Sequence, residues 1–531
     1  MSDNKCAICS APAQHKCSAC KLVSYCSKEH QKKDWKKHKE ICRPFEVLSS
    51  PEIGRYLVAT RDLKPGDLLL SEVPLVVGPK IRDAAPSCLN CLRRIDPNPS
   101  TARCPLCLWL FCTPTCPTDP KVHAPECCIL RLDPRRPPCY DVITPLRCLL
   151  LQRKHPERWK QLLSMEAHNK ERGPETDTYK EIQKQVAGPL HNRYLQHLDS
   201  DVLEHRSVEL IHQLCGILDV NALEIRLPEG NEIIAVYPTA FLMEHSCVPN
   251  TRHSFEMSPG SRQYRITVRA ARNIFKGDHI TTMYTHALWG TQARRDHLKS
   301  TKYFSCRCPR CSDPTELGTY LSALRCLGTT SNGEPCGGIH LPVFPLEDET
   351  EWHCDRCLMS LSSSQVAELV THIGEEVDNV QQGSPTVKEL EALLDKMSHL
   401  LHPHHYHCYS VKHSLVQLYG QQHGYKPEQL TESQIKRKIE MSRDLLKVTE
   451  MLDPGWARLA LYGTVLQYEL QSALLLLARK TGKNLAEAVK EGRSLLQEAL
   501  KILEPEPEMS AGSKMSQLIQ KALRGLEDIK L

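Results

Sequence analysis

Cysteine and histidine spacing constrains this chain more than any other feature. Its 531 residues contain 26 cysteines, and 21 of these, with three histidines, lie in ligand-like positions, often in short pairs such as Cys6-x2-Cys9. Thiolates and imidazoles at this spacing are typical of tetrahedral zinc sites. Free thiols or disulfides are the alternative interpretation. Twenty-four groups, four to a site, predict about six zinc ions.

The first ligands alternate in pairs near the start of the chain. They are Cys6, Cys9, Cys17, Cys20, Cys26, His30, His38 and Cys42. The alternation predicts a cross-braced module in which the first and third pairs bind one zinc and the second and fourth pairs bind another. Too few apolar residues separate the ligands to form a core, so metal binding must supply the folding free energy. The pattern resembles a MYND zinc finger, which implies a partner that presents a short proline-containing peptide.

A lysine-rich run lies within the same finger. It comprises Lys32, Lys33, Lys36, Lys37 and Lys39. Such a run suits nucleic acid, but it is more often the solvated face of a short helix. The formal net charge of +5 treats every cysteine as neutral, whereas thiolates in six zinc sites lower it to about −4. We therefore do not expect nucleic acid to be the main partner.

Two segments far apart in the sequence carry the signals of one β-rich domain. Apolar runs flank the turn at residues 64–67 (KPGD), which predicts a strand, a turn and a strand. Residues 241–250 (FLMEHSCVPN) set polar side chains and a proline after an apolar run, which predicts a tight buried crossing. Residues 54–57 (GRYL) resemble the G-R-G-L run of SET-domain methyltransferases. The turn at residues 64–67 resembles their L-x-P-G-D turn, and residues 241–250 resemble their NHSCxPN motif. The resemblance implies an S-adenosylmethionine site beside the crossing.

The resemblance also implies roles for individual residues. Tyr284 matches the tyrosine whose hydroxyl faces the reacting methyl group, so it is the expected catalytic residue. The expected cofactor-binding residues are Arg55, Tyr56, Asn221, Glu244, His245 and Phe304. Without the resemblance, an asparagine at position 221 is usually a turn residue, and a tyrosine in a strand is usually part of the core.

Three positions depart from the SET pattern. Tyr56 replaces a glycine, Glu244 replaces the first asparagine of NHSCxPN, and Lys302 stands where a second pocket tyrosine is expected. A side chain at position 56 would narrow the cofactor pocket, because glycine lets the backbone lie close to a ligand. An ionised Glu244 cannot donate hydrogen bonds and is costly to bury unpaired, so it would pair with the cofactor's positive groups or with Lys302.

Two further cysteine clusters follow the β-rich segments. Cys306, Cys308 and Cys311 supply three zinc ligands, and the SET resemblance implies Cys247 as the fourth, which would pin this segment over the cofactor site. Cys326, Cys336, Cys354 and Cys357 form another set of four. Nothing in their surroundings suggests an open coordination position, so we expect a structural zinc site there.

A second eight-ligand pattern interrupts the β-rich segments. Its ligands are Cys88, Cys91, Cys104, Cys107, Cys112, Cys116, His123 and Cys127. Cys128 adjoins the last of them, so the sequence leaves open which of these two cysteines binds zinc. A MYND module inserted in a split SET domain resembles the SMYD family, and the extra N-terminal finger resembles its arthropod SmydA branch.

The last third of the chain has helical periodicity. Apolar residues from Val387 to Leu401 recur on one face, and similar stretches follow. They resemble the TPR-like region of SMYD proteins, although no clear 34-residue repeat is present. The histidine-rich run at residues 402–407 would suit a metal, but it is more often a polar interhelical loop.

The predicted fold class is α+β: a split β-rich SET domain with an inserted MYND finger, an extra N-terminal MYND finger, a post-SET zinc cluster and an all-α TPR-like C-terminal domain. The predicted boundaries are an N-terminal finger (1–45), the first SET part (46–85), the second finger (86–130), a helical insert (131–215), the SET core (216–300), post-SET zinc (301–315), a four-cysteine ribbon-like segment (316–360) and the helical domain (361–531).

The main functional hypothesis is an S-adenosylmethionine-dependent protein-lysine methyltransferase that acts on histone or other proteins and takes part in transcriptional regulation. The alternative is a weak or inactive SET and MYND adaptor, and a nucleic-acid-binding protein is the third reading. The start of the chain lacks a secretory signal, and no apolar run is long enough to span a bilayer. We therefore expect a monomer of the nucleus and cytoplasm without membrane association.

Overall fold

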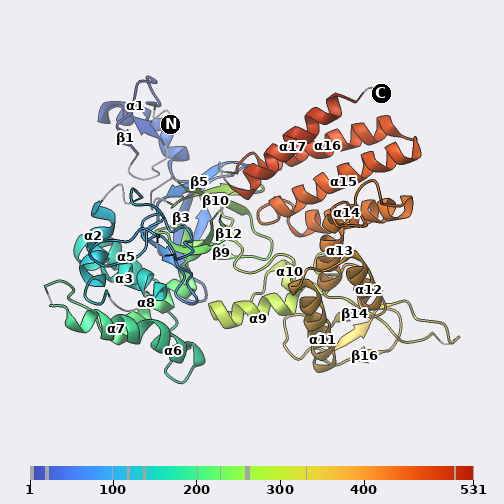
Figure 1. The fold of residues 1–531 in the computed structure, drawn as a ribbon, viewed down its shortest axis with the longest axis horizontal. Coiled ribbons are helices and arrows are strands. Elements are labelled where there is room, and N and C mark those ends of the chain that lie inside the picture. The colour runs from blue at the N-terminus through green and yellow to red at the C-terminus, as the bar shows by residue number, and fades with distance from the viewer. Residues whose placement is uncertain are drawn as a thin grey trace.

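The computed structural model describes residues 5–17, 23–98, 100–116, 120–134, 139–199, 201–227, 229–257, 264–330, 332–506 and 510–529. The predicted α+β class is confirmed, because a first half that carries most of the strands precedes a second half built of helices (Figure 1). Helix α9 (Thr291–Lys302) lies between the two halves. This helix connects the β-rich domain to everything that follows it.

The N-terminal finger consists of two short strands and one helix. These are β1 (His15–Lys16), β2 (Ser24–Tyr25) and α1 (Lys28–Cys42). Ser27 caps the helix, because its Oγ accepts a hydrogen bond from the backbone N–H of His30 at 3.3 Å. The predicted lysine run lies on α1, and its side chains are exposed. The small buried cluster of the finger is mostly cysteine, as expected for a module stabilised by metal.

The β-rich domain is assembled from several small sheets. Its strands are β3 (Phe45–Ser50), β4 (Gly54–Ala59), β5 (Leu68–Glu72), β6 (Val76–Pro79), β7 (Leu223–Arg226), β8 (Glu232–Val236), β9 (Glu244–His245), β10 (Thr251–Met257), β11 (Tyr264–Ala270) and β12 (Thr281–Thr282). They pair in the orders β3-β4, β6-β8-β7, β10-β11-β5 and β9-β12. Strand β11 alternates buried and half-buried residues, as its sequence pattern predicts. The apolar faces of β4, β5, β8 and β11 share one core.

The predicted strands on either side of residues 64–67 both form, but they do not pair with each other. Strand β4 pairs with β3, whereas β5 pairs with β11. Gly66 adopts a φ of +90° in the turn between them and donates its N–H to the Ala270 carbonyl at 2.8 Å. The turn therefore carries the chain from one sheet to another. Strand β4 also lies beside His279, because Val58 and His279 form an isolated β-bridge.

A helical insert and the second finger form one packed unit. The helices are α2 (Pro120–Leu130), α3 (Ile143–Leu149), α4 (Leu151–Lys154), α5 (Pro156–Leu163), α6 (Asp177–Ile182), α7 (Gly188–Arg193) and α8 (Val208–Asn221), with a π-helical turn (Gln183–Ala187) and 3-10 turns (Tyr140–Val142, Leu195–His197). Buried cysteines of the second finger share an apolar core with these helices. Ser207 caps α8 by accepting from the Leu210 N–H at 3.2 Å. The other end of α8 is Asn221, so this helix carries an expected site residue towards strand β7.

The second half begins with the four-cysteine segment and continues as packed helices. A small antiparallel sheet, β13 (Leu324–Arg325), β14 (Ile339–Pro342), β15 (Trp352–Cys354) and β16 (Ser360–Leu361), follows α10 (Pro309–Ser312). The helices are α11 (Ser363–Gln382), α12 (Val387–Ser398), α13 (Tyr406–Leu418), α14 (Glu432–Leu452), α15 (Ala460–Thr481), α16 (Leu485–Leu503) and α17 (Ala511–Glu527). From α12 onward each helix packs on the next, so helix pairing is present even without a sequence repeat.

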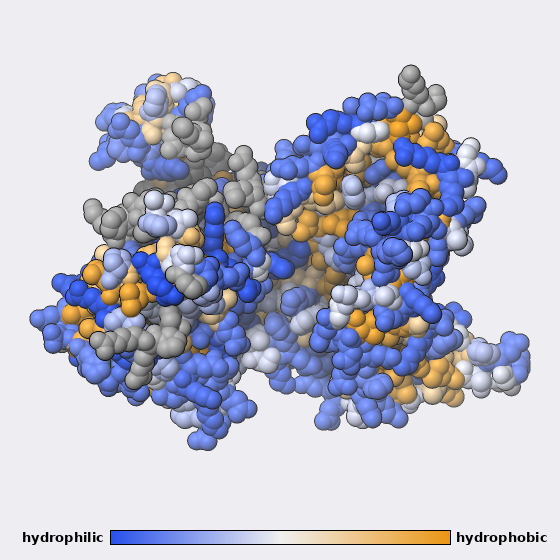
Figure 2. Space-filling model, viewed as in Figure 1, coloured by the Kyte–Doolittle hydropathy of each residue, from blue (hydrophilic) through white to orange (hydrophobic). Residues whose placement is uncertain are grey.

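The C-terminal helices return to the β-rich domain. Arg252 on β10 donates to the Ile502 carbonyl at 3.0 Å and pairs with Glu506 at 3.3 Å. Gly455 lies so close to Ala271 that a Cβ there would be 2.7 Å from the Ala271 carbonyl oxygen. Between these contacts and α9 the molecular surface is hollowed (Figure 2). Among the described helices, none is long and apolar enough to cross a membrane.

Candidate functional site

The predicted crossing at residues 241–250 lies at the centre of the β-rich domain. Strand β9 runs parallel to β12, with Glu244 opposite Thr281 and His245 opposite Thr282. The buried Asn250 side chain fixes the crossing from the other side: its Oδ1 accepts from the Thr281 N–H at 2.8 Å, and its Nδ2 donates to the His279 carbonyl at 2.8 Å. A parallel pair this short depends on such side-chain bonds, because it has few ladder bonds of its own.

Tyr284 and His245 are held together at this crossing. The Tyr284 hydroxyl donates to the Met243 carbonyl, and its backbone N–H donates to His245 Nδ1 at 3.0 Å. Burial raises the pKa of Tyr284, so the hydroxyl stays protonated. Burial also lowers the pKa of His245 to about 4, which keeps the imidazole neutral. With Nδ1 accepting, the remaining proton lies on Nε2, which is 3.3 Å from the sulfur of Cys247.

Phe304 closes over the same pair. Its ring centroid lies 5.8 Å from that of His245 and 6.5 Å from that of Tyr284. Helix α9 ends at Lys302, and Tyr303 follows it in the left-handed region at φ +61°, which turns the chain back over the site. Three residues predicted as one site therefore come together, from β9, the segment after β12, and the segment after α9.

The four cysteines predicted to close this site converge. The Sγ atom of Cys247 lies 3.5 Å from that of Cys311 and 4.0 Å from that of Cys306, and Cys308 completes the group. A tetrahedron with zinc–sulfur bonds of about 2.3 Å places its sulfurs about 3.8 Å apart, so the donor set fits zinc. The metal would join the crossing to the segment that carries Phe304.

Arginine and glutamate side chains that the sequence reasoning missed surround this cluster. Arg294 on α9 donates to the sulfurs of Cys247 at 3.2 Å and Cys311 at 3.4 Å. It also pairs with the buried Glu316 at 2.7 Å, and Glu316 in turn pairs with Arg310 at 3.0 Å. Guanidinium groups stabilise thiolates, so this network supports the zinc site from behind.

The three departures from the SET pattern have defined surroundings. Glu244 pairs with His279 at 2.5 Å, which was not one of the expected partners. The Tyr56 ring stacks on the same imidazole at a centroid distance of 4.6 Å and an interplanar angle of 21°. His279 therefore connects two departures that look independent in the sequence. It follows a Lys-Gly-Asp turn, and nothing in that pattern marked it.

Lys302, the third departure from the SET pattern, lies beside Tyr284. Its Nζ donates to the carbonyls of Asp219 at 2.9 Å and Val220 at 2.7 Å, and it lies 6.0 Å from the centroid of the Tyr284 ring. Burial lowers the pKa of Lys302 from its ordinary 10.5 to about 8. The alternative pairing of Lys302 with Glu244 is thus not the one observed.

Asn221 and Arg55 lie at the edge of the cluster. Asn221 ends α8, and its side-chain amide donates to the carbonyls of Glu166 at 2.8 Å and Ile217 at 2.9 Å. Arg55 donates to the Ser164 carbonyl at 2.8 Å and lies over the Phe241 ring at 5.4 Å. The Arg55 contact holds the helical insert against the β-rich domain, whereas both Asn221 bonds lie within the insert.

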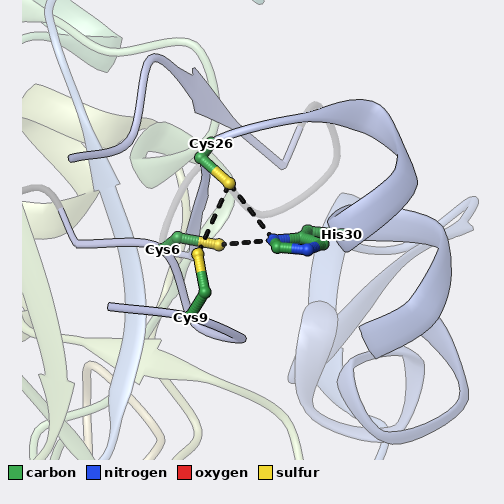
Figure 3. Close-up of side chains that lie close together, drawn as sticks. All are labelled: Cys6, Cys9, Cys26 and His30. Carbon is green, nitrogen blue, oxygen red and sulfur yellow. Dashed lines mark hydrogen bonds between the residues drawn. The ribbon is translucent and has the colours of Figure 1, made fainter. Parts of the chain in front are cut away.

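The predicted ligands of the fingers also converge. In the first finger the sulfurs of Cys6, Cys9 and Cys26 lie together and face the imidazole of His30, which reaches them from the first turn of α1 (Figure 3). Its Nδ1 lies 3.1 Å from the sulfur of Cys26. For the other site of this finger, the sulfurs of Cys17 and Cys42 are 3.6 Å apart, and Cys20 lies outside the described residues.

The second finger and the four-cysteine segment complete the metal centres. Their groups are Cys88, Cys91, Cys112 and Cys116; Cys104, Cys107, His123 and Cys127; and Cys326, Cys336, Cys354 and Cys357. Cys127 lies in its group, whereas the neighbouring Cys128 is exposed. His123 Nδ1 lies 3.0 Å from Glu126, whose carboxylate pairs with Arg147 at 2.8 Å. This carboxylate orients the metal-binding imidazole, and its position three residues after His123 on one helix was a usable sequence signal.

Comparisons with known proteins agree with this arrangement. The model of the MYND finger matches residues 6–42, and the model of the SET domain matches residues 54–285. SmydA-8 isoform A of Drosophila melanogaster is 31% identical over 329 residues, covering 59% of this chain and 64% of the relative. Histone-lysine N-methyltransferase ASHR1 of Arabidopsis thaliana is 25% identical, covering 70% and 75%, and human N-lysine methyltransferase SMYD2 is 27% identical, covering 50% and 60%.

The chain spans slightly less than two thirds of the length of SmydA-8. A solved SET domain of LSMT bound to lysine and AdoHcy aligns over 94% of this chain and 92% of that chain. The two are 12% identical and the TM-score is 0.26, which is too low a score to establish a shared fold. The matched models, the similar relatives and the converging cysteine clusters agree with one another. The chain therefore carries a MYND finger and a SET domain, and it is similar in sequence to SmydA-8 of Drosophila melanogaster and to human SMYD2.

Proposed function

We propose that this chain is an S-adenosylmethionine-dependent protein-lysine methyltransferase of the SMYD type. The observation that carries the proposal is the protonated Tyr284 hydroxyl, held against the Met243 carbonyl beside a neutral His245. Two similar proteins, ASHR1 and human SMYD2, are named as lysine methyltransferases, which supports it. The expected substrate is a lysine side chain of a histone or another protein.

The residues at the site fit this cofactor in part. When bound, S-adenosylmethionine supplies an electrophilic methyl group on a sulfonium. The half-buried Phe304 ring suits stacking on an adenine, and a neutral His245 avoids placing a second positive charge beside the sulfonium. The Tyr284 hydroxyl and the Met243 carbonyl bring two oxygens to one place, where they favour a partly positive methyl group. Phe304, pinned by the cysteine cluster, excludes water from these oxygens.

Calorimetry with S-adenosylmethionine tests the proposal on the zinc-loaded protein, together with mass spectrometry of methyl transfer to histone-derived peptides. The unmodified chain is expected to bind the cofactor and to methylate a lysine. Tyr284→Phe should keep cofactor binding and lose turnover. Cofactor binding without turnover on any lysine peptide, or turnover that Tyr284→Phe leaves unchanged, would contradict the assignment.

A second candidate is an adaptor whose cofactor site has closed, and the Tyr56, His279 and Glu244 cluster favours it. The stacked ring and the ion pair occupy positions where the SET pattern has a glycine and an asparagine. In that case the unmodified chain would not bind S-adenosylmethionine, and Tyr56→Gly with Glu244→Asn would restore binding. Titrating the unmodified chain and the double variant with S-adenosylmethionine thus distinguishes the enzyme from the adaptor.

The N-terminal finger is proposed to bind a proline-containing peptide of a partner protein. Trp35 on α1 is 44% exposed and packs edge-on against His38 at 5.9 Å, so it offers an aromatic face to a proline ring. Trp35→Ala in the full chain should abolish binding of a labelled proline-rich peptide while zinc content stays constant. A role in transcriptional regulation, a monomeric state and residence in nucleus and cytoplasm belong to the same proposal.

A further inference from the structure

A cavity of about 390 Å³ lies on the far side of α9 from the crossing. It is bounded by the start of α9, the edge of the four-cysteine segment, the first turns of α11 and the start of α13. Its volume lies within the usual range of ligand sites, roughly 300–1,000 Å³. Tyr284, His245 and Phe304 do not line it, and the two places share only Glu316, which belongs to the network behind the zinc site.

The walls of the cavity combine aromatic rings with acidic groups. Trp352 and Tyr406 supply the rings, and four carboxylates lie around the space. No lysine or arginine is among the described residues that line it. Cations outside the lining pair with Glu316 and Asp348, so the negative charge that remains to attract a cationic ligand is that of Asp296 and Asp313.

Asp296 is the carboxylate that remains available. Asp348 is already paired with Lys299 at 2.9 Å and with Arg295 at 3.4 Å, and Glu316 is paired with Arg294 on α9 at 2.7 Å. Asp313 accepts hydrogen bonds from Thr315 and Leu317 in its own loop. Asp296 accepts only from Gln292 at 2.9 Å and has no cationic partner within the described chain. Asp296 is an exposed residue of the cavity lining; partial burial raises the pKa of its carboxyl, whereas Gln292 and the nearby Lys299 and Arg295 lower it.

His405 contributes a donor to the same cavity. The side chain is fully buried, and its Nδ1 accepts from the His407 N–H at 3.3 Å, so a neutral ring carries its proton on Nε2. Burial holds the pKa of His405 well below its usual value, which keeps the ring neutral. Its Nε2 has no hydrogen-bond partner among the described residues. A buried donor of this kind favours a ligand that brings an acceptor such as a peptide carbonyl.

We propose that this cavity binds an arginine side chain of an extended peptide from a partner protein. The guanidinium pairs with Asp296 and packs between Trp352 and Tyr406, and a backbone carbonyl of the peptide accepts from His405. Arginine fits better than a compact ammonium ion, because its planar group stacks on aromatic rings while it binds a carboxylate. The inference is independent of methyl transfer and of the cofactor.

Binding of acetyl-Ala-Ala-Arg-Ala-Ala-amide to the full zinc-loaded chain tests the proposal, measured by calorimetry in a Tyr284→Phe background so that no methyl transfer occurs. We expect saturable binding that Asp296→Asn weakens by about tenfold or more, since a charge-assisted pair is lost. Glu368→Gln is the matched control, because Glu368 is an exposed acid on α11 that does not line the cavity. Ala367→Trp, which places a large ring at the cavity wall, should also abolish binding.

The citrulline analogue of the peptide separates charge from shape and should bind at least about tenfold more weakly. Equal affinity for arginine amide, or for spermidine, would overturn the peptide assignment, because neither brings the peptide's full set of carbonyl acceptors. No binding of the arginine peptide, or binding that Asp296→Asn leaves unchanged, would overturn the proposal as a whole. Each protein is checked for zinc content and circular dichroism, so loss of folding is recognised.

Discussion

Replacing Lys302 with methionine should stabilise the protein near neutral pH. Lys302 is held among carbonyls and beside Tyr284, and burial lowers its pKa from 10.5 to about 8. In the unfolded chain this lysine returns to its ordinary pKa, so between the two values the unfolded state binds more protons than the folded state. The stability of the unmodified protein therefore rises with pH through this window, and the cost of charging Lys302 is fully present below the folded pKa.

The magnitude follows from the same shift. A difference of about 2.5 pKa units corresponds to a cost of roughly 3 kcal/mol at about pH 7, and about 2 kcal/mol of this cost is relieved by about pH 9.5. The hydrogen bonds from Lys302 to the Asp219 and Val220 carbonyls are lost in Lys302→Met at either pH, so they add a nearly constant offset. The difference in unfolding free energy between variant and unmodified protein should hence shrink by about 2 kcal/mol over this range.

Urea-induced unfolding of the zinc-loaded unmodified protein and of zinc-loaded Lys302→Met, at about pH 7 and at about pH 9.5, measures this difference. Lys299→Met is the matched control, because Lys299 lies on the same helix with its side chain 62% exposed and pairs with Asp348. A difference that stays constant within about 0.5 kcal/mol between the two pH values would refute the reasoning, since it would mean that Lys302 carries no buried charge.

The remaining predictions concern the zinc sites and the crossing. Cys127→Ser should lower the zinc content by one ion in native mass spectrometry, whereas Cys128→Ser should leave it unchanged; the opposite pattern would reverse the ligand assignment. Glu316→Gln should destabilise the protein by about 3–5 kcal/mol in urea unfolding, because Arg294 and Arg310 lose their buried counter-charge, and a cost below about 1 kcal/mol would argue against a buried ion network. Tyr56→Gly and Glu244→Asn should couple in a double-mutant cycle of cofactor affinity by about 0.5 kcal/mol or more, since both contact His279; strictly additive effects would contradict that link.

Zinc ligands were predictable because metal coordination fixes residue type and spacing together. The short pairs in the fingers and the Cys306–Cys311 run specify their own partners within a few residues. Cys247 differs, since 59 residues separate it from Cys306, and only resemblance to a known motif pointed to it. The choice between Cys127 and Cys128 needed the helix, which turns one sulfur inward and its neighbour out.

The polar partners around the site were not predictable from local sequence. His279 reaches Glu244 across the β9-β12 pair, and Lys302 meets carbonyls at the end of α8. Such contacts arise from how sheets and helices stack, and no periodicity or spacing encodes them. The two strands on either side of residues 64–67 were predicted, but the strands with which they pair were not. A turn alone does not say whether the chain folds back on the same strand or passes to another sheet.

The bond from Cys247 to the post-SET cysteines has a consequence for supply of the metal. One ion would close a chain loop of 59 residues, and the segment that it would fasten includes Phe304. Without the ion, the segment after α9 loses this attachment, and holding it over the crossing costs conformational entropy. Zinc would thus fix the aromatic cover over Tyr284, so the supply of zinc would set how much of the protein has a finished site.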